Sequence, residues 1–86
     1  MAEGFAFRLV SPEGVALEAE VESLVLPGAS GSFGVWRSHE PWVVLLQAGQ
    51  VEYRAMDGEW RRSRISGGIA AVGREGTLVL ADSAEV

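Results

Sequence analysis

Residues 15–26 read VALEAEVESLVL, and this stretch decides the fold class. Up to Val21 apolar and mainly acidic positions alternate, which is the pattern of a β-strand with one buried and one solvent-exposed face. Beyond Val21 the alternation slips by one residue, because Leu24 and Leu26 fall on the opposite parity. Since such a slip turns side chains to the other face, we predict a β-bulge or a crossing between two sheets at residues 22–23.

Turn signals divide the rest of the chain into segments that suit strands and are too short for most helices. The clearest of these glycine and proline turns lie at residues 11–14, 27–28, 48–49, 57–58, 67–68 and 73–76. No segment has the periodicity of an amphipathic helix. The 86 residues therefore predict a single all-β domain of short antiparallel strands, a sandwich or a barrel, without a substantial helix.

Two segments are apolar at every position and break the alternating pattern. They are residues 42–46, WVVLL, and residues 78–81, LVLA. Such runs are typical of strands covered on both faces. We predict that they lie at the centre of the fold or are covered by a partner.

The dipeptide Asp57-Gly58 lies between two strand-like segments and is the strongest hairpin signal in the chain. A two-residue turn would place Arg54 opposite Arg61 and Tyr53 opposite Arg62. In that register the Arg62 guanidinium lies on the Tyr53 ring, a cation–π contact of about 0.5–1 kcal/mol at an exposed site. The arginines at 61, 62 and 64 form a solvated hairpin face or a patch for an acidic partner.

Composition excludes several function classes. The chain has no cysteine, which rules out disulfides, zinc–thiolate sites and thiol nucleophiles. It has no lysine either, since all seven basic residues are arginines, so a P-loop and Schiff-base chemistry are excluded. A net charge of −5 argues against general binding to nucleic acid or anionic membranes. With no apolar run long enough to span a membrane and no signal peptide, a soluble, cytoplasmic protein is expected.

Few residues suggest catalysis or metal binding. The single histidine, His39, has only Glu40 beside it as a second candidate ligand, so a metal site would need carboxylates from elsewhere. A serine triad lacks the sequence context of a nucleophile elbow. The glycines at 28, 31 and 34 indicate a tight exposed loop rather than a phosphate cradle, because the spacing, the helix and the lysine of such motifs are missing. We expect no cofactor.

Tryptophan at positions 36, 42 and 60 is frequent for so short a chain. Trp36 and Trp42 flank the polar segment 37–40, and tryptophan is enriched at binding hot spots. Trp36 is interpreted as an interface residue, whereas Trp42 suits the core and an interface equally.

The order of these turn motifs resembles the N-terminal domain of the epsilon subunit of F-type ATP synthases. The resemblance rests on G-x-x-G-x-x-G-V at residues 28–35, H-x-P at residues 39–41, S-G-G at residues 66–68 and A-D-S-A at residues 81–84. It extends over nearly the whole chain and implies an antiparallel β-sandwich of two five-stranded sheets. Residues 36–38 and Glu40 depart from the family pattern.

The resemblance also implies partners. It implies a non-catalytic subunit of the central rotor stalk, bound to the gamma subunit and resting on the membrane ring of c subunits, at the cytoplasmic face of a bacterial inner membrane. The residues that resemble the gamma-facing surface are Ser11, His39, Glu40, Trp42 and Val44, and those that resemble the loop facing the c-ring are Ser30, Gly31, Ser32 and Phe33.

Two expectations concern the extent and the alternative role of the chain. Relatives in the family continue past the A-D-S-A motif into a helical hairpin that can restrain ATP hydrolysis, so a short form without that hairpin is expected. The alternative function is a stand-alone small β-barrel that binds a ligand, with His39 and Glu40 at its mouth.

Overall fold

The computed structural model describes residues 4–35 and 41–85, and within these residues the chain forms strands and no helix. The all-β prediction is confirmed. The nine strands are β1 (Phe5–Ser11), β2 (Gly14–Gly28), β3 (Gly31–Val35), β4 (Trp42–Leu46), β5 (Gly49–Ala55), β6 (Trp60–Ile65), β7 (Gly68–Gly73), β8 (Gly76–Ala81) and β9 (Ala84–Glu85). His39 and Glu40, together with Trp36, lie outside the described residues.

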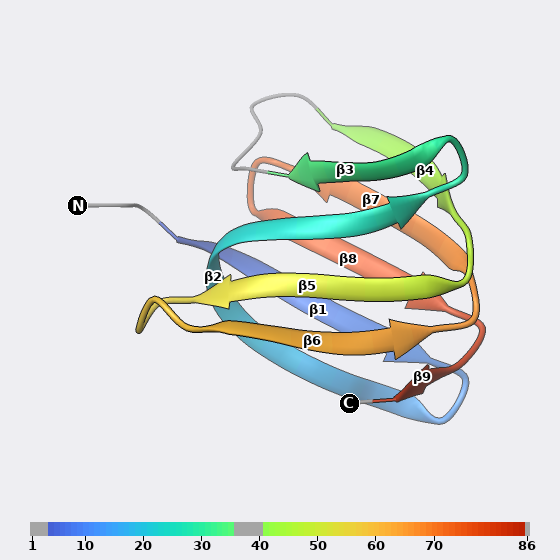
Figure 1. The fold of residues 1–86 in the computed structure, drawn as a ribbon, viewed down its shortest axis with the longest axis horizontal. Coiled ribbons are helices and arrows are strands. Elements are labelled where there is room, and N and C mark those ends of the chain that lie inside the picture. The colour runs from blue at the N-terminus through green and yellow to red at the C-terminus, as the bar shows by residue number, and fades with distance from the viewer. Residues whose placement is uncertain (1–3, 36–40, 86) are drawn as a thin grey trace.

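Hydrogen bonding connects all nine strands into one continuous sheet that folds into two layers (Figure 1). The first layer has the order β4, β7, β8, β1 and the first half of β2. The second has the order β3, the second half of β2, β5, β6 and β9. Because β2 takes part in both, each layer contains five strands, as the sequence resemblance implied.

The 15-residue strand β2 crosses between the layers where the sequence pattern slips. Val21 pairs with Phe5 in the first layer and with Ala55 in the second, and the β2–β5 register shifts between Val21 and Ser23. This shift turns the side chains, so that Val21 and Leu24 are both buried although they fall on opposite parities. The predicted crossing at residues 22–23 is therefore confirmed.

One strand pair departs from the expected antiparallel arrangement. Strands β1 and β8 are parallel, with Phe7 opposite Thr77 and Leu9 opposite Val79. A parallel pair needs a long connection rather than a tight turn, and strands β2 to β7 supply it here. Local turn signals do not report such a distant pairing.

The core lies between the two layers. Its largest fully buried side chains are Phe7, Leu9, Leu24, Leu26 and Ile65. Phe7 of the first layer contacts Tyr53 of the second, with ring centroids 5.6 Å apart at an interplanar angle of 47°. Such a tilted aromatic contact adds to the area that the rings bury, so these two rings help to hold the layers together.

The β5–β6 hairpin has a longer turn than the two-residue turn predicted from Asp57-Gly58. The Ala55 N–H donates to the Glu59 carbonyl at 2.9 Å, and the Gly58 N–H donates to the Ala55 carbonyl at 2.8 Å. Gly58 has a φ of +89°, a conformation that glycine adopts without strain. Ala55 therefore faces Glu59, and three residues, 56–58, form the turn between them.

The longer turn shifts the hairpin register by one residue, so the predicted pairs are wrong. Arg54 lies opposite Trp60 and Tyr53 opposite Arg61, and the expected stacking of Arg62 on the buried Tyr53 ring is therefore not formed. The physical reason is burial of Ile65 and Ser63. In the observed register both side chains share the inner face of the hairpin, whereas a two-residue turn would have turned them outward with Gln50 and Glu52.

Candidate docking surface

The outer face of the first layer is apolar over β4, β7 and β8. Val43 and Leu45 of β4 are 69% and 65% exposed, and Ile69 of β7 and Leu80 of β8 are 40% and 50% exposed. We call these four residues the apolar face. The outward face of an antiparallel sheet is normally polar where water covers it, so an exposed row of aliphatic side chains marks a surface that a partner covers.

Strand register makes the apolar face continuous. Leu45 lies opposite Ile69, Ile69 opposite Leu80 and Leu80 opposite Val10, which gives one apolar row across four strands. The next row contains Val43, Ala71 and Leu78 and ends in Arg8. Neighbouring strands lie about 4.8 Å apart, so each row extends over about 14 Å.

The outer face of the second layer is charged instead. Its outward side chains on β5 and β6 include Gln50, Glu52, Arg54, Trp60, Arg62 and Arg64. Arg54 Nε lies 3.3 Å from Glu22 Oε2 of β2. This charged face is suited to contact with water, so the outer faces of the two layers differ in polarity.

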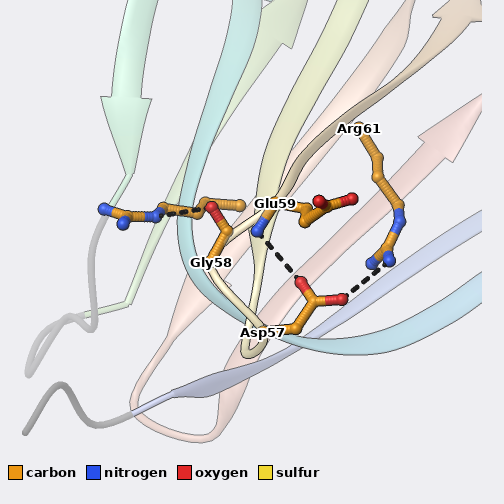
Figure 2. Close-up of polar contacts among 5 residues, drawn as sticks. Asp57, Gly58, Glu59 and Arg61 are labelled. Atoms are coloured by element: carbon orange, nitrogen blue, oxygen red, sulfur yellow. Dashed lines mark hydrogen bonds and ion pairs between the residues drawn. The ribbon is translucent and has the colours of Figure 1, made fainter.

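The turn of the β5–β6 hairpin is ordered by polar contacts (Figure 2). Asp57 Oδ1 accepts the Glu59 N–H at 3.0 Å, and its Oδ2 lies 2.9 Å from Arg61 Nη2. The Glu59 backbone hydrogen bond and the Arg61 guanidinium lower the pKa of the Asp57 carboxyl below its ordinary value. Arg54 Nε also donates to the Gly58 carbonyl at 3.2 Å.

Of the residues predicted to face gamma, His39 and Glu40 lie outside the described residues, and Ser11 lies apart from Trp42 and Val44. Ser11 lies at the end of β1, where its Oγ accepts the Glu13 N–H at 3.3 Å. Trp42 lies at the opposite end of the layer, in the row of Val72, Thr77 and Phe7. Val44 and Leu46 point inward along β4, and Val44 packs against the core. Of the three that the structure describes, Trp42 and Val44 lie on one strand.

The residues predicted to face the c-ring form the β2–β3 hairpin. Gly28 pairs with Gly31 across a two-residue turn, and Ser30, Gly31 and Ser32 are exposed. Phe33 is half-buried, and its ring lies 5.6 Å from the Trp42 ring, tilted by 52°. The two rings therefore close one corner of the sandwich together. The resemblance implied different partners for them, the c-ring for Phe33 and gamma for Trp42.

The hairpin is joined to β4 by backbone hydrogen bonds. The Ala29 N–H donates to the Leu45 carbonyl at 3.1 Å, and the Gln47 N–H donates to the Pro27 carbonyl at 2.8 Å. A hollow of about 470 Å³ lies between residues 28–33 and 43–45. The exposed hairpin tip is thereby fixed beside the apolar face.

None of the four residues of the apolar face was among the predicted site residues, although the sequence contained a signal for them. Its members Val43, Leu45 and Leu80 belong to the two runs that are apolar on both parities, and Ile69 pairs with both runs. Their predicted coverage on both faces is not provided by residues 4–35 and 41–85.

No group of three or more histidine or carboxylate side chains among residues 4–35 and 41–85 is placed to hold a metal ion. Nor does the described part of the chain include a helix long and apolar enough to cross a bilayer.

Comparison with known proteins identifies the family. Residues 4–86 match the family model described as the ATP synthase delta/epsilon chain, β-sandwich domain. An ATP synthase epsilon chain of Desulfitobacterium hafniense is 38% identical over 85 residues, which cover 99% of this chain and 64% of the relative. An epsilon chain of Rhodopseudomonas palustris is 44% identical over 80 residues, covering 93% of this chain and 58% of the relative.

Solved structures agree on the fold. A chain in the Euglena gracilis mitochondrial ATP synthase superposes with a TM-score of 0.85 at 25% identity, covering 94% of this chain and 52% of that one. A chain in the central stalk and c-ring of the Tetrahymena thermophila enzyme has a TM-score of 0.76 at 11% identity, a likeness of fold alone. The sequence spans less than two thirds of the curated relatives that it matches. It belongs to the family of ATP synthase delta/epsilon chains and contains that family's β-sandwich domain.

Proposed function

We propose that this chain acts as a non-catalytic subunit of the central stalk of a proton- or sodium-translocating F-type ATP synthase. It binds the gamma subunit through the apolar face and rests on the c-ring through the β2–β3 hairpin at residues 30–33. Its place is peripheral, at the cytoplasmic face of a bacterial inner membrane. Neither a cofactor nor nucleic acid belongs to this role.

The observation that carries the proposal is the apolar face itself. Burying an aliphatic side chain contributes about 1.5–3 kcal/mol, so four such residues at the centre of an interface supply much of a stable contact. The face also lies beside the hairpin that the resemblance relates to the c-ring, because the Ala29–Leu45 hydrogen bond joins the two. A partner on the apolar face and a partner at the hairpin tip would therefore be held at adjacent sites.

The sandwich is suited to transmitting torque. Every strand is hydrogen-bonded to at least one neighbour, and β2 joins the layers covalently. Such a body deforms little when two partners are displaced against each other, provided that both interfaces resist slipping.

A double substitution on the apolar face tests the proposal. Val43→Asp with Leu45→Asp places two carboxylates in the interface, and the affinity for the gamma subunit of the same source should fall at least about tenfold. The fold should persist, because both side chains are already largely exposed. Affinity is measured by calorimetry, and folding by the thermal midpoint of the isolated chain.

Trp60→Asp is the matched control, since Trp60 is 56% exposed on the outer face of the second layer. Its affinity for gamma should remain within about twofold of the parent value. Unchanged gamma affinity in a folded double variant would overturn this assignment of the interface.

The ligand-binding barrel is the less favoured alternative. The space between the layers is filled by the core side chains, and the family match covers residues 4–86. Its proposed mouth, His39 and Glu40, lies outside the described residues.

A further inference from the structure

A hollow of about 770 Å³ adjoins the apolar face at the β7–β8 turn. Ala71 and Leu78, which lie in the same outward row as Val43, line it, so the hollow is continuous with the proposed interface. Arg8 of β1 and Arg74 of the turn line it too. We call this site the arginine hollow.

Among the described residues, the charges around the arginine hollow leave one arginine without an ion pair. Arg8 Nε lies 2.8 Å from Glu18 Oε2 of β2, so that charge is already compensated. Arg74 is exposed and makes no ion pair with any residue that the structure describes. Glu75, the next residue in the turn, also lines the hollow but does not bind Arg74.

We propose that the gamma subunit carries an aspartate or glutamate that enters the arginine hollow and binds Arg74 when gamma covers the apolar face. This inference rests on the proposed function, because it specifies the chemistry of the partner at the same surface. Arginine presents several N–H donors in a planar fork and pairs well with a carboxylate.

Charge complementarity favours a carboxylate here. The chain carries a net charge of −5, so an acidic side chain of a partner meets repulsion over much of the molecule. Beside the apolar face, the arginine hollow offers a guanidinium over a floor that includes Ala6, Ala71 and Leu78. Once gamma excludes water from that floor, the attraction between carboxylate and guanidinium strengthens, which fixes the orientation of gamma along the sheet.

Charge reversal at Arg74 tests the proposal with the gamma subunit as the probe. Arg74→Glu should weaken gamma binding at least about tenfold, and Arg74→Ala should weaken it less, because it removes attraction without adding repulsion. The loss should shrink as salt is raised, since salt screens charges that are not fully buried. Arg62→Glu, an equal change of charge on the outer face of the second layer, is the control and should change affinity by less than about twofold.

Substitution on gamma completes the test. One exposed Asp or Glu of gamma, changed to Arg, should weaken binding to the parent chain and restore binding to the Arg74→Glu variant. Equal affinities of the parent, Arg74→Glu and Arg62→Glu chains would overturn the arginine hollow and leave the apolar face intact. Failure of the parent chain to bind gamma at all would overturn the proposed function and, with it, this inference.

Discussion

At the scale of single residues, β4 shows what pattern can and cannot decide. The run WVVLL predicts a strand with apolar side chains on both faces, and both faces are indeed apolar. It does not say which parity points inward. The register with β7 and the contact between Phe33 and Trp42 turn Trp42, Val44 and Leu46 toward the core, which exposes Val43 and Leu45.

Thr77 is a second residue whose role only the structure reveals. Its side chain is 4% exposed, and its Oγ1 has no hydrogen-bond partner among the residues described. A buried hydroxyl without a partner costs about 1–3 kcal/mol. Thr77→Val keeps the shape and removes that cost, so the free energy of unfolding should rise by about 1 kcal/mol, as measured by urea denaturation.

Thr77→Ser is the control for shape. It keeps the hydroxyl and removes a methyl group, and it should lower the stability by about 1 kcal/mol. A Thr77→Val variant less stable than the parent chain would show that the hydroxyl does make a stabilising hydrogen bond.

At the scale of elements, the prediction was right for the crossing in β2 and wrong for the register of the β5–β6 hairpin. The difference depends on whether the residues that set the register are neighbours in the sequence. The crossing in β2 is encoded locally, since the parity slip lies within one strand and forces the turn of its side chains. The length of the β5–β6 turn is not encoded locally, because an Asp-Gly dipeptide fits more than one loop length. Burial of Ile65 and Ser63 on the inner face with Val51 selects the three-residue turn, and these residues lie outside the turn sequence.

The same loop has a pH-dependent contribution to stability. The pKa of Asp57 is lowered in the folded chain, first by the Glu59 N–H and then by Arg61. Its contribution is therefore fully present above the pKa of the unfolded state and is lost as the pH falls through the lower folded value. Asp57→Asn keeps an acceptor for the Glu59 N–H but removes the charge that faces Arg61.

We expect the parent chain to unfold at a higher urea concentration than Asp57→Asn at pH 7. That difference should shrink as the solution is acidified below the ordinary range of aspartate, about pH 4. Carbon-detected NMR titration of the Asp57 carboxyl measures the folded pKa directly. A difference in midpoint that grows on acidification would contradict this account of the loop.

At the scale of the whole molecule, the asymmetry between the two outer faces carries the functional argument. The order of turn motifs was sufficient to predict the two five-stranded layers through family resemblance. The parallel β1–β8 pair and the joining of the β2–β3 hairpin to β4 were not predicted, because they bring together residues far apart in the sequence. Those contacts place the hairpin tip at one end of the apolar face and the arginine hollow at the other.

Cross-saturation NMR tests the central claim most directly. The chain, labelled at its methyl groups, is bound to the unlabelled gamma subunit, and saturation is transferred from gamma to the methyl groups within reach. We predict strong transfer at Val43, Leu45, Ile69 and Leu80, and none at Val25 and Met56, which lie away from the apolar face. Transfer confined to the second layer, or equal on both layers, would contradict the assignment of the apolar face as the gamma-binding surface.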